Sequence, residues 1–107
     1  MKITDLLSTS AIQINGSANS KEELISKMVD LMANNGNIIN KEEYKRVVLE
    51  REKEGTTGIG EGIAIPHAQS EAVNAPGLAA MVVKDGVDYQ SLDNQPAKLF
   101  FMIAVPK

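Results

Sequence analysis

The stretch KLFFMIAV, Lys98–Val105, contains the longest apolar run of the chain and decides the expected fold. A continuous run of this kind is typical of a strand that is buried on both faces of a sheet. Earlier in the chain, two shorter apolar stretches predict further strands, Leu78–Val83 and Ile63–Ile65. Ala11–Ile14 alternates weakly and is consistent with one more short strand. We expect the chain to turn at Lys84–Gly86, between two of these stretches.

Two segments earlier in the chain have the spacing of amphipathic helices. Ser20 and Glu23 form the sequence pattern of a capping box, and apolar residues follow at helical spacing, which predicts a helix over Lys21–Asn34. The same start signal, an asparagine with a glutamate three residues later, precedes a second predicted helix, Lys41–Lys53. Arg51 takes the next position on the apolar stripe of that helix. A cation there either extends into solvent or points into a site.

Helices that are followed by several strands predict an α/β layered domain, with a mixed β-sheet flanked by helices. The 107 residues suffice for one small domain. The net charge of −3 argues against a nucleic-acid partner, and the lack of cysteine excludes disulfides and a thiolate zinc site. The start of the chain has no apolar signal segment, and no apolar run is long enough to cross a bilayer. We therefore expect a cytoplasmic protein without direct membrane insertion.

The segment Gly55–Gly62 has four glycines in eight residues, and we expect it to be an irregular loop. The strand Ile63–Ile65 should end at Pro66, because proline cannot donate to a central ladder. His67 then lies just past a strand end, beside the glycine-rich loop. The loop lacks the Lys-Ser/Thr pair of a P-loop and is not followed by the helix of a dinucleotide fingerprint. With one histidine in the chain, we expect neither a metal nor a cofactor.

These residues favour phosphoryl transfer through His67. A neutral imidazole is a competent nucleophile near neutral pH. Backbone amides of the glycine-rich loop, at Gly58 and Gly60, and the hydroxyls of Thr56 and Thr57 are candidates for cradling phosphoryl oxygens. Arg51 can add a planar, permanently charged fork.

Each of these residues also has a plainer interpretation. A single histidine can be structural or merely exposed, and the glycines can be turn residues. Arg51 can form a surface ion pair with Glu54 or Asp85, while the carboxylates of Glu50, Glu52 and Glu54 together suggest a solvated helix face. A Ser-His-Asp triad stays possible from composition, although no nucleophile-elbow sequence is present.

Three stretches closely resemble the enzyme IIA domain of bacterial phosphoenolpyruvate-dependent sugar phosphotransferase systems, of the fructose/mannitol type. They are Leu49–Glu52, the glycine-rich segment Gly55–Gly62, and Ile63–Ala68, which holds the Ile-Pro-His block. Gly86–Tyr89 and Phe101–Pro106 are most similar to the fructose branch. The resemblance covers nearly the whole chain. It implies that His67 is the phosphoacceptor, that Arg51 is the active-site arginine, and that a mixed sheet is flanked by helices.

The resemblance also implies partners. The donor is expected to be the phosphorylated histidine phosphocarrier protein, and the acceptor a IIB domain that feeds a membrane sugar permease. A regulatory module of the same fold, whose phosphorylation state controls a partner protein, is the alternative, and an interaction domain with a structural His67 is another. The family continues beyond this chain's last residue, Lys107, into further helices, so we expect residues 1–107 to be a IIA domain truncated at its C-terminus.

Overall fold

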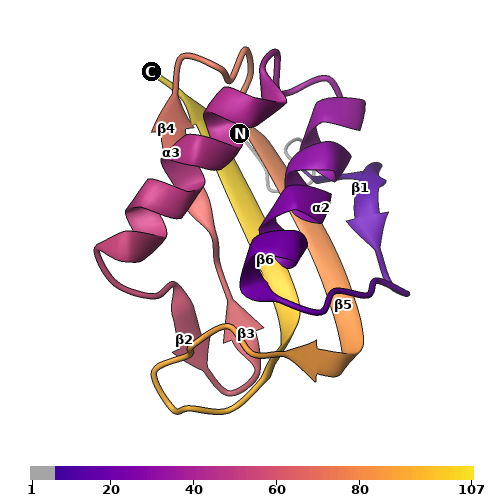
Figure 1. Cartoon of the computed structure of the whole chain (residues 1–107). Coiled ribbons are helices and arrows are strands. Elements are labelled where there is room, and N and C mark those ends of the chain that lie inside the picture. Colours follow the sequence, from indigo (N-terminus) through magenta and orange to yellow (C-terminus); the bar gives the residue numbers. More distant parts are fainter. Residues whose placement is uncertain (1–6) are drawn as a thin grey trace.

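The computed structural model describes residues 7–107, which form a mixed sheet with two helices in front of one face (Figure 1). This arrangement confirms the predicted fold class. In chain order the elements are β1 (Leu7–Gln13), α2 (Lys21–Asn34), α3 (Lys41–Lys53), β2 (Gly58–Gly60), β3 (Ile63–Ala64), β4 (His67–Ser70), β5 (Gly77–Val87) and β6 (Ala97–Pro106).

The long strands β5 and β6 form the antiparallel centre of the sheet. On one side, β1 runs parallel to β5. On the other side, β3 and β4 both run parallel to β6, and β2 closes that edge antiparallel to β3. The sheet is therefore mixed, with the short strands β2, β3 and β4 on one side of β6.

Both helices have the predicted bounds, because their caps form as the sequence indicates. The Ser20 hydroxyl accepts from the Glu23 amide at 3.1 Å, and the Asn40 side chain accepts from the Glu43 amide at 3.1 Å. Helix α2 packs on β5 and β1, and α3 packs on β4. The core lies between the helices and the sheet. Its largest fully buried side chains include Tyr44, Tyr89, Phe100, Leu24, Ile25 and the methionines at 28, 32, 81 and 102.

Strand β6 is buried on one face among the described residues, 7–107, although the sequence predicts burial on both faces. Phe100, Met102 and Ala104 point toward the helices and are buried. Ile103 and Val105 alternate with them and are 39% and 41% exposed. The run is thus apolar on both faces, as the sequence indicates, and within residues 7–107 both helices lie on the same side of the sheet and cover one of these faces (Figure 1).

Two segments that were expected to be irregular are parts of strands. Lys84–Gly86 is not a turn, because β5 continues through it to Val87 with a register shift after Val82. In the glycine-rich segment, Gly58–Gly60 forms β2 and pairs with β3 through a two-residue turn. The turn residues, Glu61 and Gly62, have φ of 58° and 79°. Positive φ at both positions is the requirement of a type I′ hairpin turn.

The strand beside β6 is interrupted at Pro66 rather than ended there. Strand β3 pairs with the first half of β6, and β4 pairs with its second half, starting at His67 opposite Ile103. Pro66 has no N–H to donate, but its carbonyl accepts from the Ile103 amide at 3.1 Å. His67 therefore lies just past the end of β3, as predicted, and it also begins a new strand, which the sequence did not indicate.

Candidate active site

His67 is half-buried, and one of its ring nitrogens is committed to the backbone. Nδ1 lies 2.8 Å from the carbonyl oxygen of Ile65, two residues earlier. A carbonyl only accepts, so in the neutral ring Nδ1 carries the hydrogen and Nε2 keeps the free lone pair. Ile65 lies in the break between β3 and β4, and its carbonyl is therefore available to His67 Nδ1. The fold thus leaves one defined nucleophilic nitrogen on His67.

Arg51 lies in the same pocket as His67. This open pocket of about 240 Å³ is lined by the last two turns of α3 and the start of β4, including Arg51, Glu50, Glu54, His67 and Gln69. The Arg51 guanidinium donates through Nη1 to the Gly55 carbonyl at 2.8 Å. Within residues 7–107 it forms no ion pair, so neither Glu54 nor Asp85 is its partner there. The structure therefore brings together the two residues that the sequence singled out.

Two carboxylates flank this pocket. Glu50 is bound by Arg46 at 2.8 Å, and both Glu50 and Glu54 are exposed. Their exposure confirms the prediction of a solvated face at these two positions. Negative charges on the rim oppose a bound phosphoryl group, whereas the Arg51 guanidinium attracts it. Arg51 is therefore the group in the pocket whose charge suits a phosphoryl anion.

The four loop residues that were predicted to cradle phosphate lie outside the His67 pocket. Thr57 is buried, and its hydroxyl donates to the Glu52 carboxylate. The Thr56 hydroxyl donates to the Tyr89 carbonyl at 3.2 Å and accepts from the Gly58 amide at 3.0 Å. Gly60, in β2, lies beside the Asp93 side chain. None of the four lines the pocket of about 240 Å³ that holds His67, and their cradling role stays a prediction.

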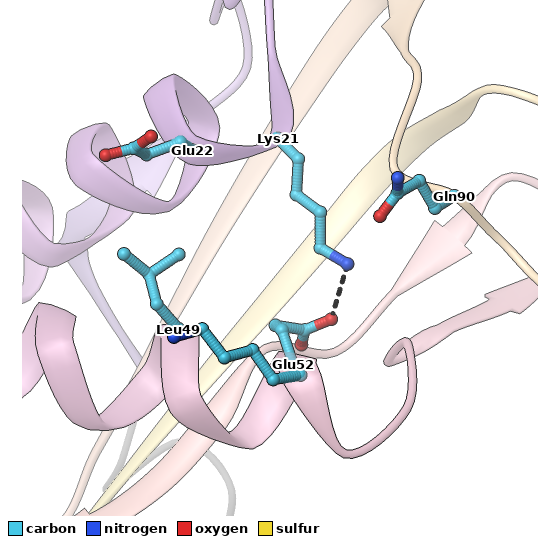
Figure 2. A pocket seen from close by; sticks show the side chains of 6 residues that line it. Lys21, Glu22, Leu49, Glu52 and Gln90 are labelled. Carbon is cyan, nitrogen blue, oxygen red and sulfur yellow. Dashed lines mark ion pairs between the residues drawn. The ribbon is translucent and has the colours of Figure 1, made fainter.

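Glu52 is the residue that the sequence interpretation placed wrongly. It is buried rather than solvated, with 5% of its side chain exposed. Its carboxylate accepts from the Thr57 amide at 3.0 Å, the Thr57 hydroxyl and the Tyr89 hydroxyl at 3.1 Å, and it pairs with Lys21 at 2.8 Å. Figure 2 shows the Lys21 side chain reaching from the start of α2 to Glu52, at the wall of a cavity of about 380 Å³.

The environment of Glu52 keeps its carboxylate charged. Burial alone raises the pKa of a carboxyl, but the hydrogen bonds from Lys21 and Thr57 outweigh burial and hold the pKa of Glu52 below its ordinary value. A signal in the sequence could have found this residue. Glu52 lies four residues after Val48 and eight after Tyr44, so it continues their buried stripe.

The pocket combines a nucleophilic nitrogen with a fixed cation, which is the chemistry of phosphoryl transfer through a phosphohistidine. Among known families, "Phosphoenolpyruvate-dependent sugar phosphotransferase system, EIIA 2" matches residues 5–107. The chain belongs to this EIIA 2 family. The match confirms the resemblance seen in the sequence.

The relatives of this EIIA 2 chain include a component of a sugar phosphotransferase system and a nitrogen regulatory protein. The chain is 49% identical over 104 residues to the PTS system fructose-specific EIIABC component of Bacillus subtilis, covering 97% of this chain and 16% of that protein. It is also similar to the nitrogen regulatory protein IIA-Ntr of Neisseria meningitidis, with 28% identity, a TM-score of 0.90, and coverage of 98% of this chain and 71% of the other.

A third similar structure is a complex of enzyme IIAMTL with phosphorylated enzyme IIBMTL from Escherichia coli. The match has 29% identity and a TM-score of 0.80, and it covers 94% of this chain and 70% of the other. The described part of the EIIA 2 chain has no helix long and apolar enough to span a membrane.

Proposed function

We propose that this EIIA 2 chain is a phosphotransferase domain that accepts a phosphoryl group on His67 and passes it on. The donor is the histidine phosphocarrier protein, and the acceptor is a IIB domain of a sugar permease of the fructose type, in the cytoplasm. One observation carries the proposal: His67 keeps Nε2 free in the pocket that also holds the Arg51 guanidinium.

The transfer step follows from this geometry. The Nε2 lone pair attacks the phosphorus atom of the donor's phosphohistidine. The N–P bond of the donor breaks, its electron pair returns to the donor imidazole, and a new N–P bond forms at Nε2. The His67 ring becomes cationic, and the Ile65 carbonyl stabilises it by accepting from Nδ1 at 2.8 Å. Arg51 stabilises charge on the moving phosphoryl oxygens. In the onward transfer, a nucleophile of the IIB domain attacks the phosphorus, the N–P bond at Nε2 breaks, and its electron pair returns to the His67 ring.

The similar IIA–IIB complex supports the choice of acceptor, and the fructose-specific relative supports the choice of sugar branch. The direct test is incubation of the chain with phosphoenolpyruvate, enzyme I and the phosphocarrier protein, followed by intact mass measurement. We expect the mass gain of one phosphoryl group, through an acid-labile and base-stable bond. Because the chain has one histidine, His67→Ala should abolish the gain. Uptake at the wild-type level in that variant contradicts the proposal.

A regulatory role is the second candidate, and the similarity to IIA-Ntr supports it. In that case phosphorylation of His67 changes the affinity for a partner protein instead of supplying a IIB domain. The two roles are separated by offering the phosphorylated chain an excess of a fructose-type IIB domain. Rapid transfer of the phosphoryl group from His67 to the IIB domain indicates the transport role. Retention of the group on His67 indicates the regulatory role.

A further inference from the structure

A buried cluster outside the His67 pocket links the two residues of the candidate site. The cluster consists of Glu52, Thr57, Tyr89 and Lys21. We propose that Glu52 is a positioning residue for both His67 and Arg51, and that Lys21 holds its carboxylate in place. The proposal rests on the proposed function for its kinetic consequence, although its structural consequence can be measured separately.

One path of hydrogen bonds runs from Glu52 to the imidazole. The carboxylate binds Thr57 twice, through the main-chain amide at 3.0 Å and through the hydroxyl. The Thr57 carbonyl in turn accepts from the Ile65 amide at 3.0 Å. The Ile65 carbonyl accepts from His67 Nδ1 at 2.8 Å. Three consecutive links therefore connect the carboxylate to the ring nitrogen that sets the tautomer of His67.

A second path runs from Glu52 to the guanidinium. The Gly55 amide donates to the main-chain carbonyl of Glu52 at 3.2 Å, and the Gly55 carbonyl accepts from Arg51 Nη1 at 2.8 Å. The turn Gly55–Thr57 is thus held at both ends by Glu52, by its main chain at one end and its carboxylate at the other. Gly55 has φ of 154°, and nothing lies within 4 Å of the position that a Cβ would take, so these bonds fix where its carbonyl points.

Lys21 and Tyr89 complete the carboxylate's set of donors. Lys21 Nζ lies 2.8 Å from Oε1 and 4.5 Å from the centre of the Tyr89 ring, and the Tyr89 hydroxyl lies 3.1 Å from Oε2. The ring of Tyr89 packs against that of Phe100 in the core, at 5.7 Å between centroids. With four donors around it, the carboxylate has one orientation, and the start of α2 is thereby tied to the end of α3.

Three substitutions separate positioning from folding. Glu52→Gln keeps the shape of the side chain but removes its negative charge, so the ion pair with Lys21 is lost. It also replaces one accepting oxygen by a donor, which changes the hydrogen bonds that the side chain can make to Thr57 and Tyr89. Thr57→Val removes the hydroxyl and leaves the main-chain link. Lys21→Met removes the cation and leaves a buried carboxylate without its partner, which lowers stability. The matched control is Glu42→Gln, the same substitution at an exposed position on the same helix.

The experiment measures three quantities for each variant: the rate of phosphoryl uptake from the phosphocarrier protein, the ¹⁵N chemical shifts of the His67 ring nitrogens, and the thermal midpoint. We expect Glu52→Gln to lower the maximal rate by about tenfold to a hundredfold with little change in the donor's KM, because misplaced catalytic groups cost rate. Its ring-nitrogen shifts should move toward a mixture of tautomers. Thr57→Val should show smaller changes of the same kind.

The double variant Lys21→Met/Glu52→Gln decides whether Glu52 acts by positioning the site or only by stabilising the fold. Removing both charges should restore the thermal midpoint lost in Lys21→Met, yet leave the rate and the ring-nitrogen shifts of Glu52→Gln unchanged. A rate that recovers together with the midpoint overturns the positioning role. Wild-type rates and shifts in a folded Glu52→Gln protein also overturn it. If the wild type takes up no phosphoryl group, the proposed function fails instead, while the ¹⁵N shifts still test positioning.

Discussion

The side chain of Arg51 is expected to contribute strongly to the rate of phosphoryl transfer. Its guanidinium is the cation of the His67 pocket, and it is held by the Gly55 carbonyl at 2.8 Å. We expect Arg51→Ala to slow phosphoryl transfer by about a hundredfold or more, since loss of one electrostatic donor has this effect in other enzymes. Arg51→Lys keeps the charge but loses the planar fork, so it should be slowed as well.

Single-turnover rates with the phosphorylated donor test this prediction. Arg46→Lys is the control, because Arg46 lies on the same helix and its ion pairs with Glu43 and Glu50 are on the surface. We expect the control to transfer at the wild-type rate. Equal rates for Arg51→Ala and the wild type contradict the role of the guanidinium.

For single residues, the sequence predicted which side chains lie together better than it predicted their surroundings, and the chemical roles of His67 and Arg51 stay predictions. His67 and Arg51 were found because their residue types and context point to phosphoryl transfer, and the structure places them in one pocket. Glu52 was missed because its charge, shared with Glu50 and Glu54, outweighed its place on the buried stripe. The donors that make its burial possible come from Lys21, Thr57 and Tyr89, and no local pattern reveals contacts across so much of the chain.

The hairpin between β2 and β3 has a backbone conformation whose effect on stability can be tested. Glu61 has φ of 58°, a conformation that costs most residues about 1–2 kcal/mol but that asparagine tolerates better. We expect Glu61→Asn to raise the free energy of unfolding by roughly 0.5–1 kcal/mol. The main-chain amide of residue 61 keeps its bond to Asp93, at 3.0 Å.

Urea unfolding of the variant measures the effect. The same substitution at Glu71, an exposed position without positive φ, should bring no gain. A fall in stability for Glu61→Asn, or an equal rise at both positions, contradicts the explanation from backbone conformation.

The elements differ in how far their own sequences specify them. Both helices were predicted to the residue, because each has a cap residue and an apolar stripe within its own segment. Strand β2 was missed, because the reason for its glycines is distant. A Cβ on Gly58 would overlap the Ser91 hydroxyl, so the close approach of residue 91 requires glycine there. The continuation of β5 past Lys84 likewise depends on pairing with β6.

Because both helices lie on one face of the sheet, neighbouring residues of β6 differ sharply in burial. Met102 is fully buried beneath the helices, whereas the neighbouring Ile103 is 39% exposed on the opposite face. We expect Met102→Ala to cost about 2–5 kcal/mol of stability, because it opens a cavity in the core. Ile103→Thr should cost less than about 1 kcal/mol. Chemical denaturation of both variants tests the arrangement, and similar losses at the two positions contradict it.

Acidification should weaken the molecule through Glu52. The hydrogen bonds from Lys21 and Thr57 hold the folded-state pKa of Glu52 below its ordinary value. A lowered carboxyl pKa stabilises the fold above the unfolded pKa of about 4.3, and this contribution is lost as the pH falls through the folded pKa. The free energy of unfolding should therefore decline below about pH 4.3.

The variant Glu52→Gln should show a shallower decline over the same pH range, because it has no carboxyl to protonate at this position. Glu42→Gln, on the exposed face of α3, should follow the wild-type curve. Parallel curves for the wild type and Glu52→Gln contradict the assignment of the acid sensitivity to Glu52.

The hydrogen bond between His67 Nδ1 and the Ile65 carbonyl has a consequence for chemical labelling. Because the chain has one histidine and one of its nitrogens is engaged, an acylating reagent such as diethyl pyrocarbonate meets a single free imidazole nitrogen, Nε2. Carbethoxylation and phosphorylation then compete for the same atom. A labelled chain is closed to phosphoryl uptake, and a phosphorylated chain is protected from the label. The extent of labelling thus reads out directly how much of the protein population carries the phosphoryl group.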